Sequence, residues 1–236
     1  MSRKSTHMSR LYAPKSWRIN RKETKWVTNT MPGTHKKDLS IPLVVAVRDN
    51  LKLVSTKREL NYLINNKLIL LNNKAVNNSK IAAGLFDVVA FPNVKKYYRV
   101  VLDKNGKFML IEISDKESNL ILLKVTKKVA AKGKKIILTL SNGYNINFDK
   151  KVSVNDTVVF DTSSGKIKNV LSYKKGEMVY FIRGKRAGNT AEYQEKTELG
   201  LFKKTYIAKL KLNKEVIDSD IKNIMSIGNG KEIKVE

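Results

Sequence analysis

Most of the side chains in this sequence that could do chemistry are cationic. Lys and Arg number 47 against 21 Asp and Glu, which gives a formal net charge of +26 at pH 7. The chain has no Cys, and its two histidines, His7 and His35, have no further ligand at a spacing that suits a metal. No paired carboxylates and no nucleophile turn stand out. The residue types favour binding of a polyanion, and we predict no enzyme, no metal, no cofactor and no small-molecule substrate.

The distribution of the charge separates nucleic acid from the other polyanions, an anionic membrane or acidic proteins. The cationic excess is spread along the whole chain, whereas a membrane binder more often gathers it on one amphipathic helix. The mean hydropathy is −0.36, and no apolar run reaches the length of a membrane span. Residues 1–20 lack the apolar core of a signal peptide, and the absence of Cys fits a cytosolic protein. We therefore predict an RNA-binding protein of the cytoplasm, without a membrane partner.

Residues 1–40 are predicted to form an extended basic arm. They hold 10 Lys or Arg, 2 acidic residues and the tryptophans Trp17 and Trp26, without a helical or strand period. Such arms order on RNA, where cations meet phosphates and flat rings stack on unpaired bases. The alternative is a disordered tail, but disordered tails are poor in aromatic residues. The candidate RNA contacts in the arm are Arg3, Lys4, Arg10, Lys15, Trp17, Arg18, Arg21, Lys22, Lys36 and Lys37.

A helix is predicted from residue 56. Thr56 and Glu59 have the spacing of a capping box, and Leu60, Leu63 and Ile64 then repeat on one apolar face. The adjacent residues 65 and 66 are both Asn, which tolerates the left-handed conformation and can end a helix. A helix with cationic side chains along it would make a small basic platform.

A tight hairpin is predicted directly after this helix. Leu68–Leu71 is too short for a second helix and suits a buried strand, and Asn72-Asn73 then turns the chain into residues 74–76. Further on, Gly84 predicts a turn, and residues 88–91 predict a buried strand that ends at Pro92.

Residues 41–54 are predicted to form another helix, because their apolar residues recur on one helical face and Pro42 fits a first turn. Their β-branched valines leave a strand as the alternative. Arg48 and Lys52 would lie four apart on the polar face and could extend the basic platform, although an ordinary solvated face explains them equally well. The candidate RNA-binding residues of this region and the platform are Arg48, Lys52, Lys57, Arg58, Lys67 and Lys80.

Residues 95–175 are typical of a β domain with three hairpins. Between the first and second hairpins lies a basic segment, residues 124–135, which we interpret as a backbone-phosphate contact or, alternatively, a solvated surface. The strands of the hairpins are predicted at 97–102 with 107–113, 136–140 with 144–148, and 158–160 with 167–171.

Residues 176–190 predict a strand followed by a tight basic turn. Met178–Ile182 is apolar, and Gly184 and Gly188 can take positive φ and let a polyanion approach the backbone. A phosphate-binding P-loop is the alternative, but its Gly-x-x-x-x-Gly-Lys-Ser/Thr spacing is missing. Further strands are predicted at 206–212 and 221–227, while 192–199 matches no pattern. The candidate RNA-binding residues of the turn are Arg183, Lys185 and Arg186.

Three stretches of this sequence resemble known families. TKRELNYLINNKLILLNNK followed by AAGLFDVVAF resembles the S4-type RNA-binding domain, and GEMVYFIRGKRAGNT resembles a KOW motif. With the arm LYAPKSWRINRKETKWV, the whole chain resembles the small-subunit ribosomal protein S4e family of archaea and eukaryotes. The resemblance implies a mostly-β α+β protein. Its parts would be a basic arm (1–40), an S4-type domain (41–94), a central β domain (95–175) and a C-terminal SH3-like KOW barrel (176–236).

The resemblance also implies a function. The chain would be a structural constituent of the cytoplasmic ribosome that binds small-subunit rRNA and neighbouring ribosomal proteins, and not a homo-oligomer. Two alternatives belong to other classes. S4-type domains also occur beside catalytic domains that act on RNA, and a KOW motif also occurs in free RNA-binding regulators of transcription or translation.

Overall fold

The protein is mostly β, with a few short helices and several antiparallel sheets. The computed structural model describes residues 7–131, 136–148, 152–199, 205–212 and 215–228. The chain divides into two compact units. The first comprises residues 1–102 and 107–121, and the second comprises residues 103–106 and 122–236. No helix in the described part of the chain is long and apolar enough to cross a membrane.

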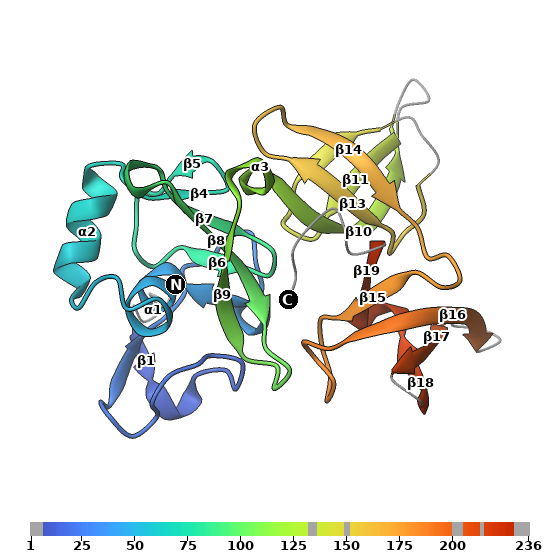
Figure 1. Ribbon diagram of the computed structural model, residues 1–236, viewed down its shortest axis with the longest axis horizontal. Helices are drawn as coiled ribbons and strands as arrows, with labels where there is room; N and C mark the ends of the chain where they lie inside the picture. The colour runs from blue at the N-terminus through green and yellow to red at the C-terminus, as the bar shows by residue number, and fades with distance from the viewer. Residues whose placement is uncertain (1–6, 132–135, 149–151, 200–204, 213–214, 229–236) are drawn as a thin grey trace. The chain divides into compact units, whose positions relative to one another are not determined.

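The first unit is built on a five-stranded antiparallel sheet with the order β5-β4-β7-β8-β9 (Figure 1). The strand β7 is buried along its whole length, as its apolar sequence predicts. It pairs with β8 across residue 94, where the resemblance placed a boundary between an S4-type domain and a central β domain. The strands of this sheet are β4 (Leu70–Leu71), β5 (Lys74–Ala75), β7 (Val88–Phe91), β8 (Lys96–Leu102) and β9 (Phe108–Ile113).

Two short ribbons accompany this sheet, β1 with β2 and β3 with β6. The second ribbon joins the end of the arm to the loop before β7, because Ser40 pairs with Gly84. The remaining elements of the unit are β1 (His7–Ser9), β2 (Trp26–Thr28), β3 (Ser40–Pro42), β6 (Ala82–Gly84), α1 (Leu43–Val45), α2 (Lys57–Asn65) and α3 (Asp115–Ser118).

Helix α2 begins with the predicted capping box. The hydroxyl of Thr56 accepts a hydrogen bond from the Glu59 N–H at 3.2 Å, and the Glu59 carboxylate accepts in return from the Thr56 N–H at 3.5 Å. The same carboxylate accepts from the Ser55 N–H at 2.8 Å and from the Thr56 hydroxyl at 2.9 Å. These donors lower the pKa of Glu59, with the Ser55 N–H as the largest cause and the Thr56 hydroxyl next. The helix ends at Asn65 as predicted, but the left-handed residue that follows is Lys67, with φ of 56°, and not an asparagine.

The predicted helix in residues 41–54 is confirmed over a shorter range. Leu43–Val45 forms α1 and continues into a π-helical turn, Ala46–Asn50, and its apolar residues are fully buried. Pro42 is the N-cap and lies in an extended conformation, not in the first helical turn. Lys52 has φ of 54° and lies beyond the helix, so the predicted polar face of Arg48 and Lys52 does not form.

The turns of the first unit are partly as predicted. Asn72 and Asn73 both take positive φ, 51° and 62°, as a two-residue hairpin between β4 and β5 requires. Gly84, predicted to be in a turn, instead ends β6, and the left-handed residue of the following turn is Phe86. A side chain at Gly84 would collide with the ring of His35, which explains the glycine.

The second unit contains a five-stranded sheet with the order β12-β11-β10-β13-β14. Its two hairpins, β11–β12 and β13–β14, are the ones predicted from sequence, and Gly143 and Gly165 take positive φ in their turns. The long strand β10 was not predicted, because its second half is a run of charged and small residues. The strands are β10 (Leu120–Ala130), β11 (Ile136–Leu140), β12 (Asn145–Asn147), β13 (Thr157–Asp161) and β14 (Lys166–Leu171).

The position of Lys124 contradicts the interpretation of this part of the basic segment 124–135 as a phosphate contact. Lys124 is buried, and its Nζ donates hydrogen bonds to the carbonyls of Ile221 and Ile224, both at 2.6 Å. Burial lowers the pKa of Lys124 to about 7, against the opposing influence of Asp220. Lys124 therefore serves the interior of the second unit and is not a phosphate contact. Residues 132–135 lie outside the described residues.

The other sheet of the second unit is a curled half-barrel with the order β18-β17-β16-β15-β19. Its core includes Val179, Phe181, Tyr193 and Leu210. The segment 192–199, which matched no sequence pattern, lies within the long strand β16. The strands are β15 (Met178–Phe181), β16 (Thr190–Leu199), β17 (Thr205–Leu212), β18 (Glu215–Asp220) and β19 (Ile224–Gly228).

Candidate nucleic-acid interface

The N-terminal arm is folded over its described residues and is not extended. His7–Ser9 pairs with Trp26–Thr28 as an antiparallel ribbon. Within the loop between these strands, the guanidinium of Arg21 donates hydrogen bonds to the carbonyls of Leu11, Ala13 and Pro14 at 3.0–3.1 Å. Arg21 was predicted to contact RNA, but these bonds occupy much of its donor capacity.

The two tryptophans of the arm have opposite environments. Trp17, the predicted RNA contact, is 2% exposed, and its indole N–H donates to the Ser40 carbonyl at 2.8 Å. Trp26, which was not selected from sequence, is 51% exposed. The ring of Trp17 is therefore part of the core, and Trp26 is the one that offers a surface to a ligand. Composition cannot make this distinction, because both rings lie among cationic residues.

The other predicted contacts of the arm divide by exposure. Arg10 is only 6% exposed, and its guanidinium donates hydrogen bonds within the protein. Arg3 and Lys4 lie outside the described residues. The exposed candidates are Lys15, Arg18, Lys22, Lys36 and Lys37.

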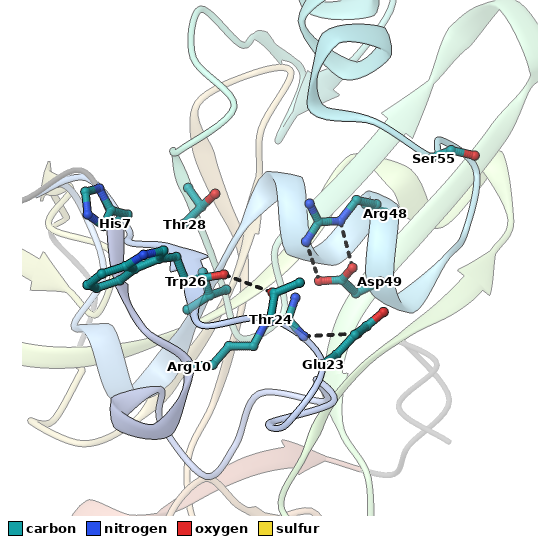
Figure 2. Close-up of a pocket in the computed structure, with 10 residues that line it drawn as sticks. His7, Arg10, Glu23, Thr24, Trp26, Thr28, Arg48, Asp49 and Ser55 are labelled. Carbon is teal, nitrogen blue, oxygen red and sulfur yellow. Dashed lines mark hydrogen bonds and ion pairs between the residues drawn. The ribbon is translucent and has the colours of Figure 1, made fainter.

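A pocket of ≈ 400 Å³ lies between the arm ribbon and the helical segment that follows it (Figure 2). Figure 2 shows two aromatic side chains at one side of the pocket and two arginine–carboxylate pairs at the other. The pocket is lined by His7, Arg10, Glu23, Thr24, Trp26, Val27, Thr28, Arg48, Asp49 and Ser55.

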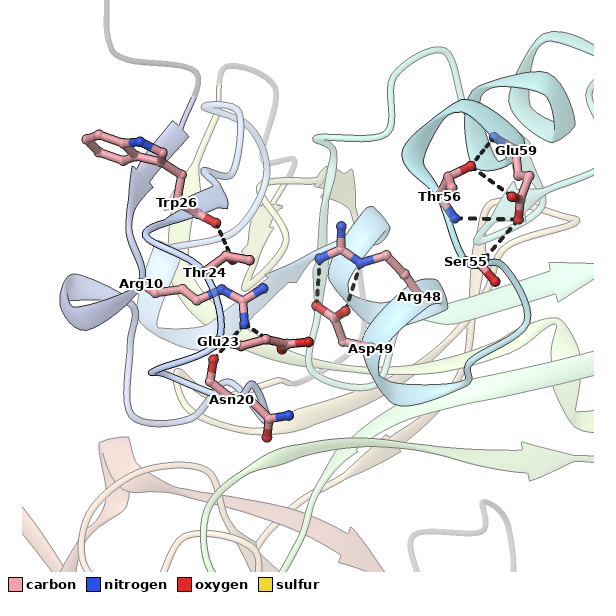
Figure 3. A network of polar contacts seen from close by, with 10 residues as sticks. All are labelled: Arg10, Asn20, Glu23, Thr24, Trp26, Arg48, Asp49, Ser55, Thr56 and Glu59. Atoms are coloured by element: carbon pink, nitrogen blue, oxygen red, sulfur yellow. Dashed lines mark hydrogen bonds and ion pairs between the residues drawn. The ribbon is translucent and has the colours of Figure 1, made fainter.

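Both arginines of this pocket are paired with carboxylates (Figure 3). Arg10 Nη1 lies 3.1 Å from Glu23 Oε2 and donates to the Asn20 carbonyl at 2.6 Å. Arg48 makes a bidentate pair with Asp49, with N–O distances of 2.8 and 3.0 Å. The hydrogen bond to Asp49 raises the pKa of Arg48, partly opposed by burial. The structure thus brings two predicted contacts together, but in a pocket of mixed charge and not on a purely basic surface.

Helix α2 carries the exposed basic platform that the sequence predicted. Lys57, Arg58 and Lys67 are exposed, and Tyr62, four residues after Arg58, is 68% exposed on the same side of the helix. Tyr62 was missed, although its position off the Leu60 face could have indicated it. An exposed aromatic ring beside an arginine suits the stacking of an unpaired base.

A second polar pocket, of ≈ 300 Å³, joins this helix to the loop before β6. Two predicted contacts, Lys57 and Lys80, line the same pocket although they are far apart in sequence. Sequence reasoning did not foresee the amide side chains that surround them. The other lining residues are Asn61, Ile64, Asn65, Asn77, Asn78 and Ser79.

The turn after β15 presents Gly184 and its cations to solvent. Gly184 and Gly188 have φ of 95° and 91°, a region that favours glycine, and a side chain at Gly184 would meet nothing within 4 Å. Arg183, Lys185 and Arg186 are exposed around them. The Gly184 half of the turn is open to close approach as predicted, whereas Gly188 is buried and its N–H donates to the Phe181 carbonyl at 2.9 Å.

The interface has no metal-binding arrangement within the described residues, where no group of three or more His, Cys, Asp or Glu side chains could hold an ion. His35 instead lies 2.9 Å from Asp87 as an ion pair. Burial lowers the pKa of His35, but the charge and hydrogen bond of Asp87 outweigh it, so that the net effect is a raised pKa.

Comparisons with known proteins agree along nearly the whole chain. Residues 94–167 match the model of the ribosomal family S4e, and residues 4–38 match the RS4NT (NUC023) domain. The small ribosomal subunit protein eS4 of Nanoarchaeum equitans is 34% identical over 224 residues, 94% of each chain. That of Archaeoglobus fulgidus is 36% identical over 182 residues, 77% of this chain and 76% of the relative.

A solved structure supports the same assignment. The crystal structure of the 30S ribosomal protein S4e from Thermoplasma acidophilum superposes with a TM-score of 0.69 at 26% identity, and the match covers 83% of this chain and 98% of that one. The chain belongs to the small ribosomal subunit protein eS4 family.

Proposed function

We propose that this chain binds and stabilises folded small-subunit rRNA through basic surfaces on several modules. As a member of the eS4 family, it is a structural, non-enzymatic constituent of the small ribosomal subunit and works in the cytoplasmic ribosome. The observation that carries this assignment is 34% identity to an eS4 protein over 94% of the chain. The net charge of +26 supplies the physical reason, since a compact chain with this charge repels itself unless a polyanion neutralises it.

The proposed modules follow the resemblance. Helices α1 and α2 with the hairpin β4–β5 would be the S4-type module, and the half-barrel β15–β19 would be the SH3-like KOW module. The arm at 1–40 and the β region at 95–175 would complete the four-part division. The capping box of α2 and the two left-handed glycines of the KOW turn support these identities.

The mechanism of binding is electrostatic and geometric. Each phosphate that a Lys or Arg neutralises releases counterions, so affinity should fall steeply as salt rises. The exposed platform on α2 and the turn at 184–188 present cations at fixed positions on rigid elements, which favours recognition of RNA shape over sequence. Binding only the folded RNA would stabilise that fold by mass action.

Neighbouring ribosomal proteins are the second class of proposed partner. The chain after residue 176 is the least basic part, with 12 Lys or Arg and 9 acidic residues. A half-barrel with this balance can bind RNA by its turn and a protein by another surface. We propose that the chain works there as a single copy and not as a homo-oligomer.

The α2 platform can be tested by removing two of its charges. Replacing Lys57 and Arg58 together by Ala should weaken binding to small-subunit rRNA and make the plot of log affinity against log salt shallower by about 1.4–1.8, because each lost phosphate contact removes about 0.7–0.9 from the slope. Filter binding or fluorescence anisotropy at several salt concentrations measures both effects.

A control variant with the same loss of net charge separates the effect of where the cations lie from the effect of total charge on RNA binding. Lys96 and Lys116 are exposed on β8 and α3 of the same unit, and their double Ala variant should keep the wild-type slope. Equal losses in the two double variants would mean that total charge matters and that α2 is not a platform for RNA.

A further inference from the structure

The pocket beside the arm ribbon is poorly suited to a phosphate. Its two arginines are each offset by a carboxylate, Glu23 and Asp49, which would repel an anion. Pairs of this kind present donors and acceptors side by side, and that combination complements a neutral ring with polar edges. The volume of ≈ 400 Å³ is sufficient for a single nucleobase and its sugar.

An aromatic surface is fixed at one side of this pocket. Trp26 is held in the ribbon by its pairing with Ser9, and His7 packs edge-on against it, with ring centroids 4.8 Å apart and planes at 80°. The Nζ atom of Lys25 lies 5.1 Å from the ring centroid. The indole is nevertheless 51% exposed. A ring held in place by its neighbours loses little entropy when a base stacks on it.

The opposite side of the pocket offers unused hydrogen-bonding capacity. Arg10 is only 6% exposed, yet its Nε–H has no hydrogen-bond partner in the described structure. A buried donor without a partner is unfavourable and gains by receiving an acceptor. Glu23, whose side chain is 61% exposed, keeps lone pairs available for N–H groups. Figure 2 places Arg10 and Glu23 together across from Trp26.

One nucleobase matches both sets of groups. Guanine has acceptors, O6 and N7, that arginine donors recognise, and N–H donors at N1 and N2 that a carboxylate accepts. Adenine has no acceptor at its position 6, and pyrimidines offer a smaller stacking face. We propose that this pocket holds one unpaired guanine of the bound RNA, stacked on Trp26 with its polar edge toward Arg10 and Glu23. This inference rests on the proposed function in rRNA binding and assigns one nucleotide to one site.

The test uses short single-stranded RNA probes with a fluorescent end label, whose anisotropy measures affinity, together with the intrinsic fluorescence of the full chain. The probes are UUGUU, UUAUU and the same pentamer with an abasic central residue. For wild type we expect the guanine probe to bind about tenfold more tightly than the abasic probe and to quench the exposed tryptophan. Trp26→Ala should abolish this difference, whereas Trp26→Phe should keep most of it. Glu23→Gln should reduce the preference for guanine over adenine.

Trp17 provides the internal control for folding. Its ring is buried and bonded to Ser40, so its emission should be the same in Trp26→Ala as in wild type and unquenched by any probe. A variant that unfolds would reveal itself by a shift of this emission.

The outcomes separate this inference from the proposed function. If wild type binds small-subunit rRNA with a steep salt slope but does not distinguish the guanine from the abasic probe, the guanine site is wrong and the proposed function stands. The guanine site is also wrong if Trp26→Ala keeps the full difference between the probes. If wild type binds neither probe nor rRNA, both proposals fail.

Discussion

Replacing Asp87 by Ala should lower the free energy of unfolding by about 3–5 kcal/mol, the range for removing one partner of a buried pair. The carboxylate is 1% exposed and accepts three bonds in the first unit. These come from His35 Nε2 at 2.9 Å, the Gly84 N–H at 2.7 Å and the Asn72 amide at 2.9 Å. Without Asp87, all three donors lose an acceptor in the interior. Urea unfolding of both proteins, followed by circular dichroism, measures the difference.

The pH dependence of the same pair provides the control. Because the pKa of His35 is raised on folding, its stabilisation is complete below about 6.5, the unfolded value, and is lost as pH rises through the folded pKa. Wild type should therefore lose stability relative to His35→Gln as the pH rises above about 6.5 and through the folded pKa of His35. A constant difference across this range would contradict the ion pair, and an unchanged stability of Asp87→Ala would contradict its structural role.

Replacing Trp17 by Ala should also lower the free energy of unfolding by about 3–5 kcal/mol, the usual cost of truncating a buried aromatic residue. The substitution leaves a large cavity beneath the arm. It also leaves the Ser40 carbonyl without the indole N–H that now binds it at 2.8 Å. Thermal and urea unfolding measure the effect, which should appear without any RNA present.

The comparison between the tryptophans makes this prediction specific. Trp17→Phe keeps most of the ring and should cost only about 1–3 kcal/mol, the penalty of the unmet hydrogen bond. Trp26→Ala, at a half-exposed position, should change stability by less than Trp17→Ala. Similar losses at both positions would show that the arm does not depend on Trp17 for its attachment.

Local patterns in the sequence were sufficient to predict α2 and the β-hairpins. The capping box joins Thr56 to Glu59, and Gly143 acts within its own turn. Because these interactions link residues that are close in the chain, the sequence alone reveals them. The glycines around Lys185 belong to the same class. Strand β10 lacked such a signal, because its second half has the composition of a basic loop.

The contacts between distant residues could not be predicted in this way. Lys124 was interpreted as a phosphate contact, but its partners are carbonyls about 100 residues away, and no local pattern encodes them. The same applies to Trp17, whose burial depends on Ser40 and on packing. Arg48 is a different case, because its partner Asp49 is adjacent in sequence and could have been considered.

The most direct test of the central claim is the sedimentation of a cell lysate on a sucrose gradient, with this chain quantified by mass spectrometry. We predict that the chain travels with the small ribosomal subunit at one copy per subunit and stays there through a moderate salt wash. Recovery in the slowly sedimenting fractions, or with a particle other than the small subunit, would contradict its role as a constituent of that subunit.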